Sequence, residues 1–306
     1  MTSNDRPIAL LSMDAGEVPE DLLPRLEANV TPVWSPAGVF DDDQAGIAEI
    51  LVTANADIDA VYLKRLPALR AVITTGTAYD YVDTEYCRTH GVKVCNTPGY
   101  TGSSVAEHAF ALLLAAARNI VFYDAVSRGA PSDSQPIAWE LAGRTVGIVG
   151  LGDIGSRIAR IAQGFGMNVV FANRSKKQFD GAEQVDLDAL LRRADAVFLT
   201  LPLTPETDGL LSADRLAVMK PTAILVNVSS DELVDVAALG ASLEVGRLGG
   251  AGVDVIGSTQ PYRDLPRAVL TPCIAWYTAE SVHRRAATWI DTISAVMAGG
   301  DRHRVA

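Results

Sequence analysis

The segment Val146–Gly155 limits the folds open to this chain more than any other part of it. An apolar run, typical of a buried parallel strand, ends at Gly150, and a helical pattern follows as far as Phe165. In this G-x-G-x-x-G arrangement Gly150 permits the tight turn, Gly152 leaves room for a pyrophosphate, and Gly155 lets the helix pack close to its strand. The free N–H groups at the helix start would face the phosphates. The segment predicts a dinucleotide-binding domain, and the alternative is an ordinary glycine turn.

Composition narrows the class of protein. A chain of 306 residues suggests about two domains, and a net charge of −11 argues against nucleic acid or an anionic membrane as a partner. The three cysteines have no metal-ligand spacing, so we expect no metal site and a reducing, cytoplasmic location. No signal peptide is expected, and the longest apolar run, Ala109–Ala117, is too short to span a bilayer.

The first 95 residues or so alternate between strand-like and helical patterns, which indicates a small doubly wound α/β domain. The loop Gly76–Asp80 follows the fourth of these strands, at the edge of the sheet where ligands usually bind. The expected strands are Ile8–Met13, Val30–Trp34, Ile50–Thr53, Ala71–Thr75 and Val92–Cys95, and the expected helices are Pro19–Leu26, Asp57–Leu66 and Asp83–His90.

A long helix is expected from Ser103 to Val126, with Ser103 and Ser104 as candidate caps and Glu107 in its first turn. Its Ala- and Leu-rich turns suit a helix that links two domains or lies in a dimer interface. A second, larger series of strands and helices follows. Its strands are expected at Asn168–Ala172, Ala194–Leu201, Ala223–Val228, Gly252–Val255 and Val269–Leu270, and its helices at Leu187–Arg192, Ala213–Met219, Val236–Val245 and Ala279–Met297.

The residues after the second strand of this series bear on the choice of cofactor. An acidic residue there normally binds the adenosine ribose, but this chain has Asn173, Arg174 and Ser175, and no carboxylate until Asp180. An arginine beside a hydroxyl suits a 2′-phosphate, because the guanidinium matches phosphate oxygens in a fork. We therefore favour NADP(H). NAD(H) stays open as the alternative, with Arg174 stacked on the adenine.

Several further stretches carry a resemblance to a known family. Together with the glycine turn they are Asn96–Gly99, Ser104–His108, Leu201–Thr207, Met219–Pro221, Ile224–Asn227, Gly252–Val255 and Leu270–Pro272. By these stretches the chain resembles the D-isomer-specific 2-hydroxyacid dehydrogenases over nearly its whole length. Within the family it is most similar to the branch that contains glyoxylate and hydroxypyruvate reductases and the C-terminal-binding-protein corepressors.

The resemblance implies an α/β fold with two doubly wound parallel-sheet domains. A Rossmann cofactor domain, residues 99–279, would be inserted in a flavodoxin-like substrate domain, residues 1–98 plus 280–306, with the active site in the cleft and a homodimer formed through the cofactor domains. A loop of Gly76, Thr77 and Ala78 would offer N–H groups to a substrate carboxylate. The implied cofactor-binding residues are Val105, Gly150, Gly152, Asp153, Ile154, Gly155, Leu201, Pro202, Thr207, Val228 and Asp254, beside Asn173, Arg174 and Ser175.

The family performs its chemistry with an arginine that clamps the substrate, a histidine that transfers the hydroxyl proton, and a glutamate that holds this histidine. By this resemblance Ser230 stands at the position of the arginine, Gln260 at that of the glutamate and Cys273 at that of the histidine, between intact landmarks. A positioned acid or base contributes roughly 10²- to 10⁴-fold to a rate. The guanidinium clamp is lost as well, and Asp231 would repel an anionic substrate. We therefore expect the ordinary reduction of 2-keto acids to be severely impaired.

Other residues offer limited substitutes. Cys273 is a candidate nucleophile or proton donor, with a small buried residue as the alternative. Tyr79, Tyr100 and Tyr277 are candidate proton donors at the cleft rim, with packing as the alternative, and Trp276 is expected to form an apolar wall of the substrate site. None of the four histidines stands where an imidazole is needed, and a structural role is expected for the one on the long helix, His108.

Three functions remain open from the sequence. The first is an NAD(P)(H)-dependent oxidoreductase with an unusual small-molecule substrate, such as an imine or a conjugated compound. An iminium already carries its positive charge, so the hydride step needs no strong acid, and Asp231 could pair with a cationic substrate. The second is an inactive NADP(H)-binding sensor or scaffold. The third is an elimination or epimerisation that uses bound cofactor without net redox change.

Overall fold

The computed structural model describes residues 6–54, 57–255, 257 and 260–306. The chain divides into two units, Met1–Tyr100 with Thr278–Ala306, and Thr101–Tyr277. Both are parallel α/β structures, so the predicted fold class is confirmed.

The first unit contains a five-stranded sheet in the order β2-β1-β3-β4-β5, with all strands parallel. This order reverses between β1 and β3, as in doubly wound sheets of the flavodoxin type. The strands are short, and all except the edge strand β2 are mostly buried, because helices cover both faces of the sheet. Their bounds are β1 Ile8–Leu11, β2 Thr31–Trp34, β3 Ala48–Thr53, β4 Ala71–Thr74 and β5 Lys93–Cys95.

Two clusters of apolar side chains form the core of this unit, one on each face of its sheet. One includes Leu11 and Val52 of the sheet with Trp289 and Ile293 of the C-terminal helix α11, which explains why residues far apart in sequence share this unit. After α11 the chain ends beside β5, where the N–H of Val94 donates to the Ala306 carbonyl at 3.0 Å. The helices are α1 Leu23–Asn29, α2 Asp42–Ile47, α3 Ala60–Leu63, α4 Thr84–Thr89 and α11 Ala279–Met297.

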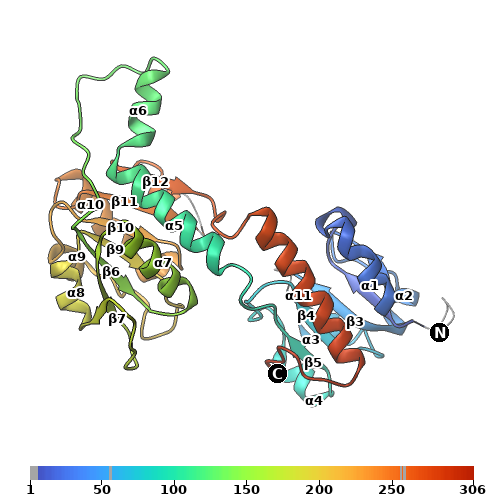
Figure 1. The fold of residues 1–306 in the computed structure, drawn as a ribbon. Helices are drawn as coiled ribbons and strands as arrows, with labels where there is room; N and C mark the ends of the chain where they lie inside the picture. Colours follow the sequence, from blue (N-terminus) through green and yellow to red (C-terminus); the bar gives the residue numbers. More distant parts are fainter. Residues whose placement is uncertain (1–5, 55–56, 256, 258–259) are drawn as a thin grey trace. The chain divides into compact units, whose positions relative to one another are not determined.

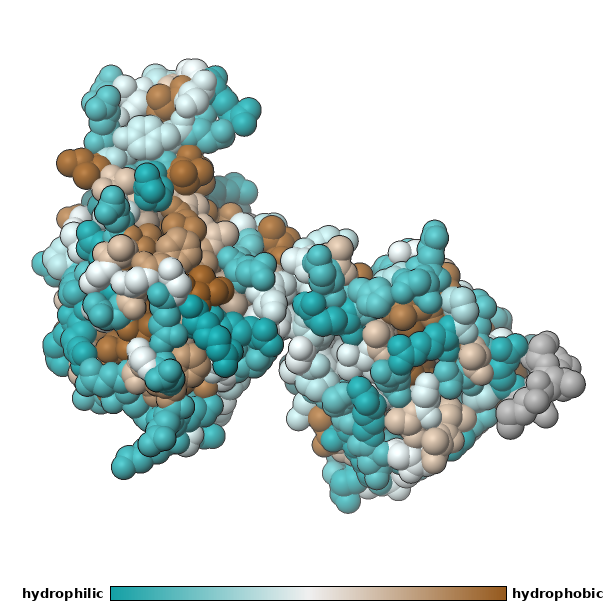
Figure 2. Space-filling view, in the orientation of Figure 1, coloured by the Kyte–Doolittle hydropathy of each residue, from teal (hydrophilic) through white to brown (hydrophobic). Residues whose placement is uncertain are grey.

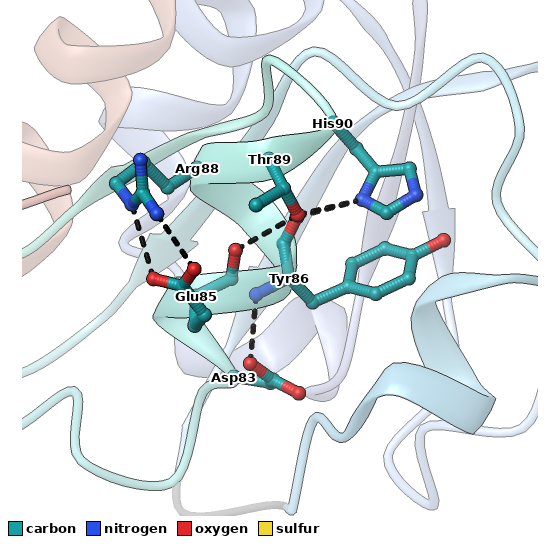
Figure 3. A network of polar contacts seen from close by, with 6 residues as sticks. All are labelled: Asp83, Glu85, Tyr86, Arg88, Thr89 and His90. Carbon is teal, nitrogen blue, oxygen red and sulfur yellow. Dashed lines mark hydrogen bonds and ion pairs between the residues drawn. The ribbon is translucent and has the colours of Figure 1, made fainter.

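Helix α4 shows how local side chains fix a short element (Figure 3). The Asp83 carboxylate caps its start by accepting the N–H of Tyr86 at 2.8 Å, and Glu85 pairs with Arg88 one turn on. At its end the rings of Tyr86 and His90 stack with centroids 3.9 Å apart. A helix of six residues is marginal alone, so these contacts stabilise it.

The second unit contains a seven-stranded parallel sheet in the order β12-β11-β10-β9-β6-β7-β8. Its order reverses between β6 and β9, and such a reversal places a crevice at the carboxyl ends of these strands. Strand β8 was not predicted. The strands are β6 Thr145–Val149, β7 Asn168–Ala172, β8 Ala182–Gln184, β9 Ala196–Leu199, β10 Ile224–Asn227, β11 Gly250–Asp254 and β12 Ala268–Thr271.

The expectation of one long helix from Ser103 to Val126 was wrong. The structure has α5, Gly102–Ala117, and α6, Ile120–Ser127, with a bend of 62° between them. Asn119 lies between them in the left-handed region at φ +53°, a conformation that stops α5 and that asparagine adopts more readily than most residues. Thr101 precedes the first turn, so Ser103 and Ser104 lie inside the helix and Glu107 lies beyond its first turn.

The remaining helices of the second unit connect its strands. They are α7 Asp153–Gly164, α8 Leu187–Arg193, α9 Ala213–Ala217 and α10 Val236–Glu244, with short 3₁₀ turns at Asp231–Leu233 and Gln260–Tyr262. Within the described residues, no single helix is both long and apolar enough to cross a bilayer, and only the bent pair α5 and α6 meets that test when counted together.

Candidate functional site

The turn after β6 has the geometry that its glycines predict. Gly150 adopts φ +97°, and a Cβ atom there would lie 2.8 Å from the carbonyl oxygen of Thr200 on the neighbouring strand's loop. A Cβ at Gly155 would lie 2.3 Å from the carbonyl oxygen of Gly150. Both positions therefore exclude any side chain, one through its backbone conformation and the other through close packing of α7 on the turn.

Gly152 differs from these two glycines, because a Cβ there would meet nothing within 4 Å. Open space above this residue and the start of α7 at Asp153 give the cradle that a pyrophosphate needs, with the first N–H groups of the helix available to it. The Asp153 carboxylate accepts Nε of Arg157 at 3.0 Å, and Arg157 also donates to Ser103 of α5 at 2.9 Å. The residues around the turn thus fit a dinucleotide.

Two side chains that follow β7 hold the peptide groups of Leu151 in the glycine turn. The Oδ1 atom of Asn173 accepts the N–H of Leu151 at 3.3 Å, and Nζ of Lys177 donates to the Leu151 carbonyl at 2.6 Å. The Nδ2 atom of Asn173 also donates to the backbone and hydroxyl oxygens of Ser175, each at 3.0 Å. A cation therefore lies against the turn, in the region that the adenosine ribose occupies in dinucleotide-binding folds.

Arg174 is exposed on the same loop, and its charge reaches the segment that follows β9. The pKa of Glu206 is lowered by a hydrogen bond from the Thr204 side chain, and to a smaller extent by Arg174. The Thr207 hydroxyl donates to the Pro202 carbonyl at 2.9 Å and accepts the N–H of Thr204 at 2.7 Å. The segment Leu201–Thr207 is therefore a loop of the second unit that is held by hydrogen bonds among its own residues.

Asp254, the last residue of β11, lies at the centre of a buried network. Its carboxylate accepts the Thr271 hydroxyl at 2.6 Å and the N–H groups of Ile274 and Ala275, each at 2.9 Å. Nε2 of His108 on α5 lies 2.9 Å from the Thr271 hydroxyl oxygen and 3.9 Å from Asp254. Asp254 is only 4% exposed, so these partners compensate for the burial of its charge. The network fixes the backbone on both sides of Cys273.

Cys273 itself is half-buried and adopts the left-handed conformation at φ +53°. Burial raises the pKa of its thiol, and the nearby carboxylates of Asp254 and Asp231 raise it further. The thiol is therefore neutral at physiological pH, which disfavours the nucleophile that the sequence left open, since the thiolate is the reactive form.

Ser230 and Asp231 follow β10 in a turn that Asn227 supports, because Nδ2 of Asn227 donates to the Ser230 carbonyl at 3.0 Å. The Asp231 carboxylate accepts the N–H of Gly257 at 2.7 Å and the hydroxyl of buried Tyr262 at 3.3 Å. Burial and the negative charge of Asp231 raise the pKa of Tyr262, which stays protonated as a donor. Part of the hydrogen-bonding capacity of Asp231 is thus committed within the protein.

The remaining predicted residues divide between the units. In the second unit Val105 is buried on α5, Val228 follows β10, Gln260 is exposed, and the rings of Trp276 and Tyr277 meet edge-on with centroids 5.1 Å apart.

In the first unit Asn96 and Thr97 hold the candidate substrate loop. The N–H of Thr97 donates to the Gly76 carbonyl at 2.8 Å, and Nδ2 of Asn96 donates to the Thr77 carbonyl at 2.9 Å. Ala78 follows in the same loop. The carbonyl of Tyr100, in the same unit, accepts Nε of Arg284 at 3.0 Å.

Sequence reasoning missed Lys177 and Thr271 as parts of the site. It also missed Gln184, whose Oε1 atom accepts the N–H of Lys177 at 2.9 Å. Lys177 lies four residues beyond Asn173, and only the fold brings its ammonium group back to Leu151. Thr271 lay inside a matching stretch, but nothing in its spacing indicated a bond to Asp254. Within the described residues, no group of three His, Cys, Asp or Glu side chains could hold a metal ion.

Comparisons with known proteins show the family and the fold of this chain. The model of the D-isomer specific 2-hydroxyacid dehydrogenase NAD-binding domain matches residues 110–275. A glyoxylate reductase of Pyrococcus furiosus is 40% identical over 250 residues, which cover 76% of this chain and 74% of that protein. A Thermus thermophilus structure is 33% identical and covers 98% of this chain and 100% of its own, with a TM-score of 0.85.

A third similar protein is an acyclic imino acid reductase solved in complex with NADPH and D-arginine. It is 28% identical to this chain, covers 97% of it and 100% of its own length, and has a TM-score of 0.84. The glycine turn, the parallel sheets, the domain match and the extent of these similarities lead to one conclusion. The chain belongs to the family of D-isomer-specific 2-hydroxyacid dehydrogenases, which are NAD-binding oxidoreductases.

Proposed function

We propose that this protein is an NADP(H)-dependent reductase whose substrate is a neutral or cationic electrophile, with an iminium as the leading class, in place of a simple 2-keto acid. One observation carries the proposal. Cys273, which we expect at the position of the family's histidine, directly precedes Ile274 and Ala275, whose N–H groups donate to the Asp254 carboxylate, and the negative charges of Asp254 and Asp231 raise the pKa of its thiol. Such charges repel the carboxylate of a keto acid and favour a positive charge on the substrate.

The chemistry of the two substrates differs in its need for a proton. Hydride addition to a ketone leaves an alkoxide, which must be stabilised and protonated as it forms. Hydride addition to an iminium leaves a neutral amine. The bound nicotinamide would supply the hydride, and this chain's residues would bind the pyrophosphate at the glycine turn and hold the backbone around Cys273 through Asp254. Ser230, Gln260 and Cys273 would line the substrate site without donating a strong acid.

The substrate loop supports a small polar ligand. The carbonyls of Gly76 and Thr77 accept hydrogen bonds from Thr97 and Asn96, and we propose that the N–H groups of Gly76, Thr77 and Ala78 bind an acceptor on the substrate. Tyr100, Trp276 and Tyr277 are proposed as further substrate contacts. The name of the structurally similar imino acid reductase supports the imine class.

NADP(H) is proposed over NAD(H) because the loop after β7 presents Arg174, Ser175 and Lys177, and Asn173 replaces the usual acid. A guanidinium, a hydroxyl and an ammonium suit a 2′-phosphate, whereas a ribose diol is best bound by a carboxylate.

We also propose a homodimer formed through the second unit. Helix α6 is rich in apolar residues but has no buried one, and it projects from the rest of its unit (Figure 1). Ile120 and Val121 are 55% and 56% exposed, and apolar residues are visible among the hydrophilic ones of this arm (Figure 2). A second copy of the chain would cover them.

The experiment compares NADPH and NADH oxidation by the purified protein against keto acids, imines and enoyl compounds. We expect turnover of an imine with NADPH, and rates for glyoxylate, pyruvate and hydroxypyruvate that are at least about a hundredfold lower. Robust keto acid reduction would contradict the proposal. Cofactor binding without turnover across the panel would support the second candidate, a sensor or scaffold, which the expected loss of the family's three catalytic side chains favours.

A further inference from the structure

Gln184, the last residue of the short edge strand β8, holds the loop that follows β7. Its Nε2 atom donates to the carbonyls of Asn173 and Ser175, each at 3.1 Å, and its Oε1 atom accepts the N–H of Lys177 at 2.9 Å. One amide side chain therefore fixes the start, the middle and the end of the loop.

The same loop is joined to the glycine turn through Leu151, whose N–H and carbonyl bond to Asn173 and Lys177. The backbone of residues 173–177 is thus held at fixed points on two sides, while the side chains of Arg174 and Ser175 remain exposed. Exposed loops normally lose conformational freedom when they bind a ligand, and that loss lowers affinity. Here the backbone is ordered before the ligand arrives.

We infer that Gln184 is the positioning residue of an adenosine 2′-phosphate subsite formed by the loop of residues 173–177, and that it sets the preference for NADPH over NADH. The inference rests on the proposed use of NADP(H). It adds a residue that would touch neither the phosphate nor the nicotinamide and that would act through the loop. NADH has only a hydroxyl at the 2′ position, so its binding depends less on where Arg174, Ser175 and Lys177 lie.

The test measures dissociation constants for NADPH and NADH by titration of the reduced cofactors' fluorescence. For Gln184→Ala we expect the constant for NADPH to rise by about tenfold, which corresponds to the loss of about one hydrogen bond. The constant for NADH should change less than about twofold. Gln184→Glu keeps the acceptor for the Lys177 N–H but cannot donate to the two carbonyls, and its charge would repel phosphate. It should weaken NADPH binding at least as much as alanine does.

Gln163→Ala is the matched control. Gln163 is also a glutamine of the second unit that donates to a loop carbonyl, that of Asp180 at 2.6 Å, but it does not bond to residues 173–177. The variant Gln163→Ala should leave the ratio of the dissociation constants for NADPH and NADH unchanged. Thermal unfolding of each variant shows whether the fold is retained.

The two proposals fail in different ways. Equal affinity of the unchanged protein for both cofactors would overturn the proposed NADP(H) preference. An unchanged ratio in folded Gln184→Ala and Gln184→Glu, or an equal loss for both cofactors, would overturn the role of Gln184, whatever the unchanged protein prefers.

Discussion

The hydroxyl of Thr271 donates to the carboxylate of Asp254 at 2.6 Å, across the ends of two neighbouring strands. His108 approaches the same hydroxyl from α5, so one buried network joins a helix to two strands directly beside Cys273. Asp254 in turn accepts two N–H groups from residues 274 and 275. The backbone around Cys273 therefore depends on a network that contains none of Ser230, Gln260 and Cys273, the residues that we expect at the family's catalytic positions.

Replacing Thr271 by valine removes the hydroxyl and keeps the shape of the side chain. Asp254 is 4% exposed and would lose a charge-assisted hydrogen bond, so we expect the free energy of unfolding to fall by about 1–3 kcal/mol. Chemical denaturation measures this loss. Thr271→Ser keeps the hydroxyl donor, so its free energy of unfolding should fall less than that of Thr271→Val. Equal decreases in the two variants would show that packing, and not the hydrogen bond, accounts for the loss of stability.

Lys177→Met tests the cation at the glycine turn. The Nζ atom of Lys177 donates to Leu151 at 2.6 Å, and its charge would face a 2′-phosphate. We expect NADPH to bind about tenfold more weakly, the NADH constant to change much less, and the salt dependence of NADPH binding to decrease. The neighbouring Lys176 makes no hydrogen bond within the described residues, so Lys176→Met is the control. A similar loss in both variants would show only a general effect of charge.

The pKa of Cys273 predicts slow alkylation at neutral pH. Burial and two carboxylates raise this pKa, so the thiolate fraction, and with it the rate of reaction with iodoacetamide, should increase only at a pH above the value of about 8.5 that is typical of a free thiol. Asp231→Asn removes one of the charges and should move the profile to lower pH. Cys87 and Cys95 are fully buried, and Cys273→Ser identifies any background from them. A profile centred below that of a free thiol would contradict the prediction.

How far the sequence predicted the structure depended on the kind of feature. Strand β7 and helix α11 have the predicted bounds, because long apolar or amphipathic patterns indicate them directly. The break at Asn119 was missed, since a left-handed asparagine inside an apolar helical pattern has no proline or glycine to mark it. Strand β8 is three residues long and lies at the sheet edge, where an apolar pattern is not required.

In the candidate site, too, only the features that have a local sequence pattern could be predicted. The glycine turn was predicted from local spacing, and its open cradle at Gly152 follows from that spacing. Lys177 and Gln184 act through hydrogen bonds to backbone groups of residues that are distant in the sequence or in another element. Such bonds depend on tertiary structure and leave no residue pattern. The left-handed backbone of Cys273 could not be predicted either, because nothing in its residue type requires it.

The exposed apolar residues of helix α6 predict that the protein forms a dimer. Ile120→Lys combined with Val121→Glu places charges on exposed apolar positions of the projecting arm, so we expect dimers to dissociate into monomers. Size-exclusion chromatography with light scattering measures the mass. Val245→Lys is the control, because this residue is 70% exposed in the same unit but lies outside the arm. Two outcomes would contradict the prediction, namely a monomeric unchanged protein and a dimer that survives the double substitution.

The variant Ser230→Arg, Gln260→Glu, Cys273→His tests whether three side chains account for the expected lack of keto acid reduction. Histidine tolerates the left-handed conformation at residue 273 better than most residues, so the backbone need not change. We expect glyoxylate reduction with NADPH to rise by roughly 10²-fold or more. Each single substitution should increase glyoxylate reduction only slightly, because the acid, the carboxylate that orients it and the arginine that binds the substrate act as a unit.

Asp231 complicates the restored site, since an arginine at residue 230 would lie beside a carboxylate that already bonds to Gly257 and Tyr262. The addition of Asp231→Gly removes that competing charge and should increase glyoxylate reduction further. Unchanged NADPH binding shows that each variant keeps its cofactor site. The variants could be folded and bind NADPH but reduce no keto acid faster than the unchanged protein does. In that case the three positions do not account for the low rate of keto acid reduction, and the proposed assignment of the substrate site is wrong.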